Sequence, residues 1–178
     1  MKIYIVRHGQ TEENQKRILQ GHLPGTLTPE GKEQIRMTAE RLSNENVSFR
    51  CILSSDLRRA MDSAEINADK LKLQIIPMKE LRERDWGKYT GMPLADARDK
   101  FYSNGRWQFP DSAETEEEIL NRAQNVLDKL KSEYPSGNII IVTHGLFARN
   151  LIGAHLQCPY QEVSPFMNAE IRILKIKI

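Results

Sequence analysis

The sequence lacks several features that would point to particular classes of protein. Its 178 residues include two cysteines, Cys51 and Cys158, which form no CxxC motif and indicate no disulfide framework. Cys51 lies in an apolar run and is expected to be a small buried residue. The net charge is +2, from 26 basic and 24 acidic residues, too small a surplus for broad nucleic-acid binding. A chain of this length buries roughly 70% of its unfolded surface, so it needs no disulfide or metal to fold.

Long hydrophobic runs are also absent. No segment approaches the roughly 18 consecutive apolar residues that cross a membrane. The first residues, 2–6, form a short strand-like run without the apolar stretch of roughly 7–15 residues found in signal peptides. We therefore expect a cytoplasmic protein with no membrane partner.

Three common catalytic motifs are missing as well. Gly25 and Gly31 lie one residue too far apart for a Walker loop, and Glu33 occupies the position that requires Ser or Thr. Neither a Gly-x-Ser-x-Gly elbow nor a His-Glu-x-x-His motif occurs. No set of Asp, Cys and His has the spacing of metal ligands, so we expect neither a metal site nor a cofactor.

What the sequence does contain is an alternation of β-rich runs with longer helical patterns. One run, 138–143, is almost continuously apolar, which is typical of a strand buried on both faces. In the last run, Ile171, Ile173, Ile176 and Ile178 alternate with charged residues, which predicts an edge strand with one solvated face. The predicted strands cover residues 2–6, 51–53, 73–76, 138–143 and 171–177.

Helix start signals lie between these runs. Thr28 followed by Pro29 predicts an N-cap and first turn, and Thr115 with Glu118 forms a capping box. The pattern predicts a single α/β domain over residues 1–178: a three-layer α/β/α sandwich around a mostly parallel sheet, with an antiparallel edge strand. Residues 87–112 are less regular and rich in aromatic side chains. They are expected to form either a cap over a pocket or a hydrophobic cluster packed on the domain.

Residues suited to anion binding follow three of the predicted strands. Arg7 and His8 stand at the end of the first strand, Arg59 follows the second, and His144 directly follows the fourth. Carboxyl ends of parallel strands share one edge of a sheet, where ligands bind. Arginine forks match phosphate or carboxylate oxygens, and a histidine among them can act as a covalent nucleophile. The pattern predicts a site for a dianion such as phosphate.

Each of these residues also has a purely structural interpretation. A histidine beside a glycine at a strand end is often a hydrogen-bonded turn residue. Residues 54–56 (SSD) are suited to cap the helix that begins near Leu57, and Arg58 and Arg59 are suited to a solvated helix face. The residues alone therefore indicate an anion site and do not name the reaction.

Five blocks of sequence, in this order, resemble those of the histidine phosphatase superfamily, also called the phosphoglycerate-mutase-like family. They are residues 7–14 (RHGQTEEN), 27–31 (LTPEG), 54–60 (SSDLRRA), 81–87 (LRERDWG) and 143–145 (THG). The resemblance extends over nearly the whole chain. It implies the family's α/β fold and a metal-independent transfer of a phosphoryl group.

The resemblance also implies roles for individual residues. His8 would be the nucleophile that becomes phosphohistidine. Arg7, Arg59 and His144 would hold the phosphoryl oxygens and stabilise charge in the transition state. Glu83 would donate a proton to the leaving oxygen and then activate water. Four residues match positions that line the family's phosphate pocket: Asn14, Gln20, Gly21 and Gly145.

Without the resemblance, Glu83 would be interpreted as an exposed charge between Arg82 and Arg84. As a general acid it must carry a proton in the substrate complex, which predicts an acidic to neutral pH optimum. Arg58 precedes the matching arginine and is expected at the surface.

Three functions remain open. A phosphatase acting on a small phosphomonoester is favoured over a phosphoglycerate mutase, because the resembling mutases carry a longer basic insertion in the region where this chain has Arg98, Lys100 and Arg106. The third is a non-catalytic binder of phosphorylated ligands. The expected partner is a small phosphoester, and the apolar run 171–178 leaves pairing with a second chain open.

Overall fold

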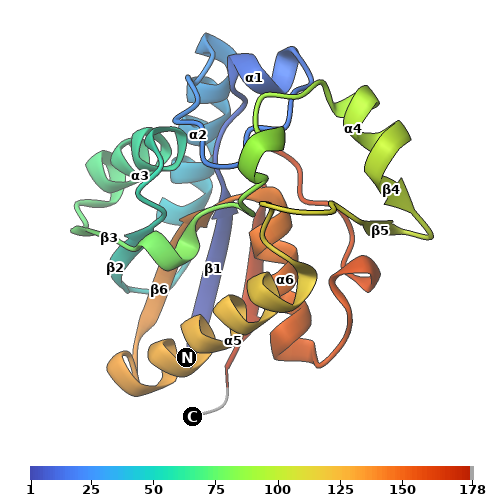
Figure 1. Ribbon diagram of the computed structural model, residues 1–178. Helices are drawn as coiled ribbons and strands as arrows, with labels where there is room; N and C mark the ends of the chain where they lie inside the picture. The colour runs from blue at the N-terminus through green and yellow to red at the C-terminus, as the bar shows by residue number, and fades with distance from the viewer. Residues whose placement is uncertain (177–178) are drawn as a thin grey trace.

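The computed structural model describes residues 1–176, which form a five-stranded sheet in the order β3-β2-β6-β1-β7 (Figure 1). All neighbouring strands are parallel except β7, which pairs antiparallel with β1 at the edge of the sheet. The predicted α/β class and its antiparallel edge strand are therefore confirmed. The bounds are β1 Lys2–Arg7, β2 Phe49–Ser54, β3 Ile75–Pro77, β6 Asn138–Thr143 and β7 Ile171–Lys175.

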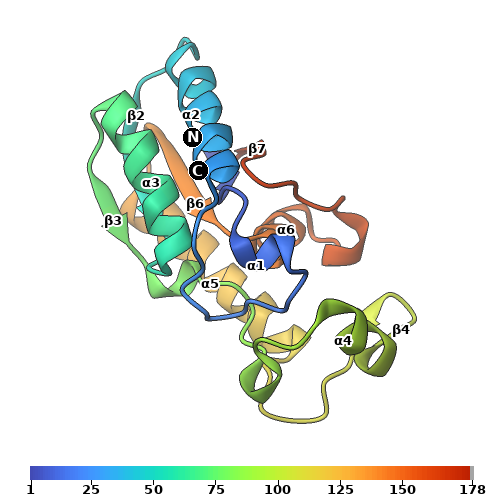
Figure 2. The same cartoon turned by 90° about the horizontal axis from the view of Figure 1, so that it is seen from above.

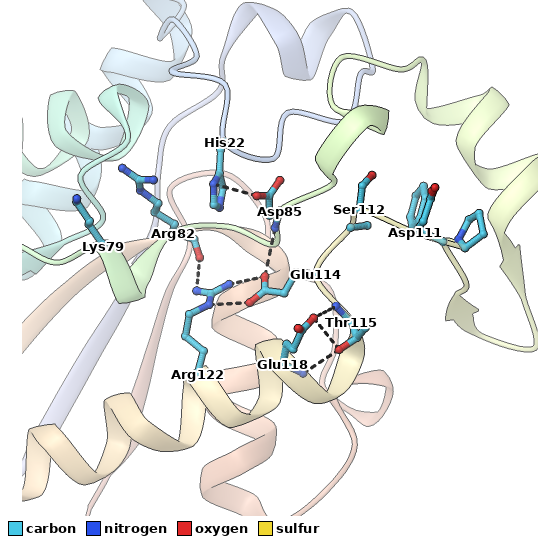
Figure 3. A pocket seen from close by; sticks show the side chains of 13 residues that line it. His22, Lys79, Arg82, Asp85, Asp111, Ser112, Glu114, Thr115, Glu118 and Arg122 are labelled. Carbon is cyan, nitrogen blue, oxygen red and sulfur yellow. Dashed lines mark hydrogen bonds and ion pairs between the residues drawn. The ribbon is translucent and has the colours of Figure 1, made fainter.

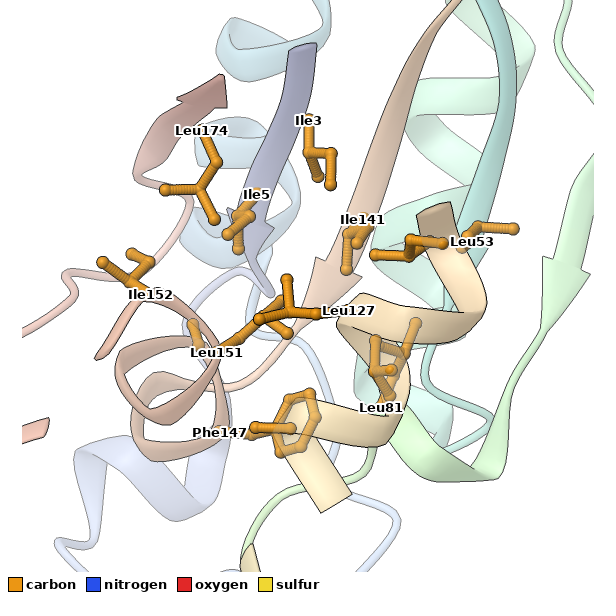
Figure 4. Packing of buried hydrophobic residues seen from close by; sticks show 14 of the residues in the cluster. Ile3, Ile5, Leu53, Leu81, Leu127, Ile141, Phe147, Leu151, Ile152 and Leu174 are labelled. Carbon is orange, nitrogen blue, oxygen red and sulfur yellow. The ribbon is translucent and has the colours of Figure 1, made fainter. Parts of the chain in front are cut away.

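Helices cover both faces of this sheet, so the sandwich has three layers (Figure 2). Side chains alternate between the faces along β1, as a period of two requires. Ile3 and Ile5 pack with α5 (Glu116–Glu133) and α6 (Gly145–Leu156), as Figure 4 shows. Tyr4 and Val6 pack on the other face with α2 (Pro29–Ser43) and α3 (Arg58–Leu71).

Of the predicted strands, 138–143 has the predicted bounds, whereas β1 extends to Arg7 and β2 is longer at both ends, Phe49–Ser54. The other two differ more. β3 begins at Ile75 instead of residue 73, because Lys72 adopts a left-handed conformation that ends α3, and the N–H of Leu73 is still bonded to Ala68 of that helix. β7 ends at Lys175, and residues 177–178 lie outside the described part of the chain. At this edge of the sheet Leu174 and Ile176 are in the core, whereas Ile173 is 44% exposed.

The predicted helix starts are observed. Thr28 Oγ1 accepts the N–H of Gly31, and Thr115 forms the capping box with Glu118. One short helix, α1 (Glu12–Gln15), was not predicted, and it carries a capping box between Thr11 and Asn14. This box orders the chain directly after His8. Within residues 1–176 no helix is long and apolar enough to cross a membrane.

Residues 87–112 form a separate unit beside the sheet. They contain a 3₁₀ turn, η2 (Gly87–Tyr89), then α4 (Leu94–Phe101), and a hairpin of β4 (Tyr102–Ser103) with β5 (Arg106–Trp107). Their aromatic side chains make a third hydrophobic cluster, and both views show the unit to one side of the sheet layers (Figures 1 and 2). Two further 3₁₀ turns are η1 (Lys79–Leu81) and η3 (Tyr160–Glu162).

Candidate active site

The carboxyl edge of the central strands brings the predicted residues together. The N–H of His8, after β1, bonds to Thr143 O of β6 at 3.0 Å, and the N–H of Ser55, after β2, bonds to Val142 O at 3.0 Å. A cavity of about 280 Å³ opens at this edge. Eight of the nine predicted site residues line it: Arg7, His8, Asn14, Gln20, Gly21, Arg59, Glu83 and Gly145.

His8 lies at the base of the cavity and is 2% exposed. Its Nδ1 lies 2.7 Å from the carbonyl oxygen of Gly9, an acceptor only, so Nδ1 carries the proton and Nε2 keeps its lone pair. Burial, together with the charges of Arg59 and Arg7, holds the pKa of His8 well below its ordinary value. The imidazole is therefore neutral at pH 7, with Nε2 available as a nucleophile.

Close backbone packing fixes the loop that carries His8. A Cβ on Gly9 would lie 2.3 Å from Gly31 O, and a Cβ on Gly31 would lie 2.0 Å from Gln10 O. Only glycine at both positions lets the first turn of α2 pack this closely against the loop. The predicted start of α2 thus also positions the histidine.

Arg59 reaches His8 from the first turn of α3. Its Nε lies 3.2 Å from His8 Nε2, Nη2 donates to Gly21 O at 2.9 Å, and Nη1 donates to Leu23 O. Burial lowers the pKa of Arg59 to about 10, so the guanidinium stays charged at neutral pH. The alternative of a solvated helix face is wrong for Arg59, which is 1% exposed. It holds for Arg58, which is exposed and pairs with Asp62 at 3.7 Å.

Arg7 and His144 each hold one buried nitrogen without a hydrogen-bond partner among residues 1–176. Arg7 Nη1 donates to Phe166 O, while its Nε has no partner. Ser55 Oγ lies 2.8 Å from His144 Nε2 and accepts the N–H of Leu57. Nδ1 is the nitrogen of the His144 ring that has no partner in this part of the chain.

His144 differs from the other predicted residues because it does not line the cavity. It is fully buried, and its ring centroid lies 5.2 Å from that of His8. Burial, with Arg59 nearby, holds its pKa well below the ordinary value, so the ring is neutral at pH 7. Residues 54–56 do not cap α3 as predicted, and Ser55 contacts His144 instead. Leu57 is the N-cap, and no side chain caps the helix.

Glu83 is held at the N-terminus of α6. Its Oε2 accepts the N–H of Leu146 at 3.1 Å, and Oε1 accepts those of Phe147 and Arg84 at 2.9 Å each. Neither adjacent arginine side chain pairs with this carboxylate: Arg82 forms a bidentate pair with Asp56, and Arg84 Nε donates to Glu114 O at 2.7 Å. Glu83 is thus a half-buried carboxylate on the cavity wall, not an exposed surface charge.

The remaining predicted residues form the rim next to α1. Gln20 Oε1 accepts the hydroxyl of Thr11, and Asn14 Oδ1 accepts from Asn168 Nδ2 at 3.2 Å. Asn168 also donates to His8 O, a contact that no motif indicated because Asn168 lies 160 residues away in the sequence. Within residues 1–176, no group of three His, Cys, Asp or Glu side chains is placed to hold a metal ion.

Sequence patterns missed the outer wall of the cavity. Arg149 lies one turn after Gly145 on α6, which the helical spacing of four residues was enough to indicate. The rest of this wall is apolar and comes from distant segments, so spacing gave no signal. Its members are Ile18, Leu19, Trp86, Leu94, Trp107, Leu146, Pro165 and Phe166.

A second, larger cavity of about 760 Å³ lies behind the Glu83 segment (Figure 3). It contains neither histidine of the strand ends nor Arg7 and Arg59, and its charges are largely paired, as in Arg122 with Glu114. We therefore assign the candidate active site to the smaller cavity, because that cavity holds His8 and the two arginines.

The fold and this cavity define a class: an α/β protein with arginines around a buried neutral histidine at the carboxyl edge of its sheet. Residues 3–177 match the family model of the histidine phosphatase superfamily (branch 1), and the chain belongs to that superfamily.

Curated relatives and solved structures agree with this assignment. Phosphoglycerate mutase-like protein 4 of Arabidopsis thaliana is 30% identical over 98% of this chain and 79% of its own length. Uncharacterized phosphatase PhoE of Bacillus subtilis is 35% identical over 80% of this chain and 71% of its own length. A mycobacterial glucosyl-3-phosphoglycerate phosphatase, solved in complex with VO3, has a TM-score of 0.85 and 26% identity, covering 98% of this chain and 92% of that structure.

Proposed function

We propose that this protein is a phosphatase that hydrolyses a small phosphomonoester through a phosphohistidine on His8. The observation that carries the proposal is the set of groups around His8 Nε2. A neutral imidazole, whose Nε2 is unprotonated and accepts the N–H of Arg59 Nε, lies beside two arginines and a second neutral histidine. Two buried nitrogens, Arg7 Nε and His144 Nδ1, have no partner among residues 1–176, and phosphoryl oxygens would satisfy both when Nδ1 carries the proton of its ring.

In the first step, His8 Nε2 attacks phosphorus while the bond from phosphorus to the ester oxygen breaks. Glu83, protonated in the substrate complex, gives its proton to that leaving oxygen, and the alcohol departs. In the second step, water attacks phosphorus and Glu83 takes a proton from it. The phosphorus–nitrogen bond breaks, and inorganic phosphate and neutral His8 result.

Arg7, Arg59 and His144 supply the electrostatic part of the mechanism. They present fixed donors to the three oxygens of the transferring group, where charge is spread in the transition state. Because the surrounding protein already holds them, little reorganisation is needed during the reaction. Gly145 lies beside Arg7, where a side chain would fill space needed by the phosphoryl group: an added Cβ would lie 3.4 Å from Arg7 Nε.

Residues 87–112 favour hydrolysis over mutase activity. Arg98, Lys100 and Arg106 do not line the cavity: Arg98 lies over the Tyr102 ring, Arg106 is 3.9 Å from Glu116, and Lys100 is exposed. The residues of this segment that line the cavity are Leu94 and Trp107, both apolar. These two side chains suit an apolar leaving group, so this segment offers no cation for the carboxylate of a phosphoglycerate.

The test is hydrolysis of p-nitrophenyl phosphate in the presence of a chelator, with the native protein, His8→Ala and the control His155→Ala. We expect turnover by the native protein and the control, none by His8→Ala, and an acid-labile phosphate on His8 in the native protein alone. Failure to hydrolyse any ester, combined with phosphate exchange between 2,3-bisphosphoglycerate and 3-phosphoglycerate, would instead establish the mutase.

A further inference from the structure

The backbone that carries Glu83 has its own support, separate from the bonds to the carboxylate. The side chain of Arg122, on α5, lies under this segment. Nη1 donates to Glu80 O at 2.8 Å and to Arg82 O at 2.7 Å, and Nη2 lies 3.4 Å from Glu83 O. One guanidinium therefore contacts three carbonyl oxygens of residues 80–83. Figure 3 shows the contact with Arg82 and the pair that Arg122 forms with Glu114.

Glu114 orients this guanidinium. Its Oε1 accepts from Arg122 Nε at 2.8 Å and its Oε2 from Nη2 at 2.7 Å, the parallel geometry of a bidentate pair. The two side chains are only 20% and 14% exposed. Oε2 of Glu114 also accepts the N–H of Asp85 at 3.2 Å, so the pair holds the chain on both sides of Glu83.

Arg122 also contacts the second support of Glu83. Its Cζ lies 4.5 Å from the centroid of the Phe147 ring, and the N–H of Phe147 donates to Glu83 Oε1. The same guanidinium thus touches the backbone that carries the carboxylate and the residue that binds it. A lysine reproduces the charge but not the planar fork that makes these bonds together.

We propose that Arg122, oriented by Glu114, is a positioning residue that sets where the Glu83 carboxylate stands relative to the leaving oxygen. This inference rests on the proposed role of Glu83 as proton donor. A displacement of about 1 Å in a reacting group costs roughly 100-fold in rate. Losing the contacts of Arg122 with residues 80–83 should therefore impair proton donation by Glu83, while His8, Arg7 and Arg59 stay in place.

The leaving group separates positioning from a general loss of structure. Ethyl phosphate needs its leaving oxygen protonated, whereas p-nitrophenolate leaves as a stable anion. For Arg122→Lys we expect kcat/KM to fall about 10- to 100-fold on ethyl phosphate and less than about threefold on p-nitrophenyl phosphate. Added to Glu83→Gln, the same substitution should cost nothing further on ethyl phosphate, because the two residues act through one proton transfer.

The matched control is Lys129→Met. Lys129 also joins α5 to this segment, through Glu80 Oε1 at 3.4 Å, but it reaches neither the Glu83 backbone nor Phe147. Its loss should leave both substrates unaffected. If Arg122→Lys does not fold, Glu114→Gln, which keeps the shape but weakens the pair, should show the same selectivity with a smaller loss.

Two outcomes would overturn the inference: equal losses on both substrates, or a further loss when Arg122→Lys is added to Glu83→Gln. A different result bears on the proposed function. If Glu83→Gln itself slows both esters equally, Glu83 is not the proton donor, and the role of Arg122 falls with it.

Discussion

Arg59 Nε lies 3.2 Å from His8 Nε2, and the two side chains are 1% and 2% exposed. The contact places a fixed positive charge beside the atom that attacks phosphorus. Arg59→Lys keeps a charge but loses the fork that also binds Gly21 O and Leu23 O. Removing one preorganised donor of this kind costs roughly 100- to 1,000-fold in kcat. We expect a loss of that size, measured with p-nitrophenyl phosphate.

The neighbouring residue provides the control for this prediction. Arg58 is exposed and pairs only with Asp62, so Arg58→Lys should leave kcat unchanged. Urea unfolding of Arg59→Lys should also show a loss of about 1–3 kcal/mol, since two buried carbonyl oxygens lose their donors. Activity of Arg59→Lys within threefold of the native value would show that the contact with His8 has no role in the reaction.

Ser55 provides a second test, directed at the tautomer of His144. The Ser55 hydroxyl lies 2.8 Å from His144 Nε2, and we expect it to donate there, which leaves the proton of that ring on Nδ1. In Ser55→Ala nothing holds the ring in this tautomer. We expect kcat to fall about 10- to 100-fold, the loss typical of removing a hydrogen-bond partner that orients a functional histidine. Ser54→Ala is the matched control, because Ser54 is equally buried and donates only to the backbone oxygen of Ser55. Equal kinetics for the two variants would contradict the assigned tautomer.

The sequence indicated that residues at the strand ends lie together, but it indicated little of what surrounds them. His8, Arg59 and His144 follow buried strands, and the topology of a parallel sheet brings such positions together regardless of side-chain detail. Asn168 and Phe166 also reach the site, yet they lie on the loop before β7, where no periodicity constrains the chain. Contacts of this kind depend on tertiary packing and leave no local pattern.

Errors in the fold have a similar origin. Leu73 has the composition of a strand residue, but its N–H is bonded to the end of α3. The alternation in the last strand did not decide which side chains are buried; the register places Leu174 opposite the buried Ile3, whereas Ile173, opposite Tyr4, is 44% exposed. A one-residue choice of this kind reverses the faces of a strand, and a run such as IRILK fits either choice.

The buried histidines predict how stability depends on pH. The pKa values of His8 and His144 lie well below 6.5 in the folded protein, whereas in the unfolded chain they take the ordinary value. Below about pH 6.5 the unfolded chain binds protons that the folded protein does not. The free energy of unfolding should therefore fall as the pH decreases from 7 to 5, by at most about 1.4 kcal/mol per pH unit for each histidine.

Urea unfolding at pH 5, 6 and 7 measures this dependence. His8→Gln should show a shallower slope between pH 7 and 5 than the native protein, and His155→Gln should keep the native slope. A native protein equally stable at pH 5 and pH 7 would contradict the neutral state assigned to both rings. The same neutrality implies that activity persists below pH 6.5, because Nε2 of His8 stays unprotonated there.

The apolar wall of the cavity predicts a preference among leaving groups. Trp107, on β5, lines the cavity and packs against Trp86 and Phe109, with ring centroids 5.7 Å away in each case. Trp107→Ala removes a surface on which an aromatic leaving group would lie. Loss of an apolar contact worth about 1–2 kcal/mol raises KM roughly 5- to 30-fold. We expect that increase for phenyl phosphate, little change for ethyl phosphate, and an unchanged kcat for both, since Trp107 contacts no reacting atom.

Tyr102→Ala is the control, because Tyr102 packs on the same Trp107 ring at 4.9 Å but does not line the cavity. An equal rise in KM for both esters with Trp107→Ala would show that the leaving group does not lie on this wall.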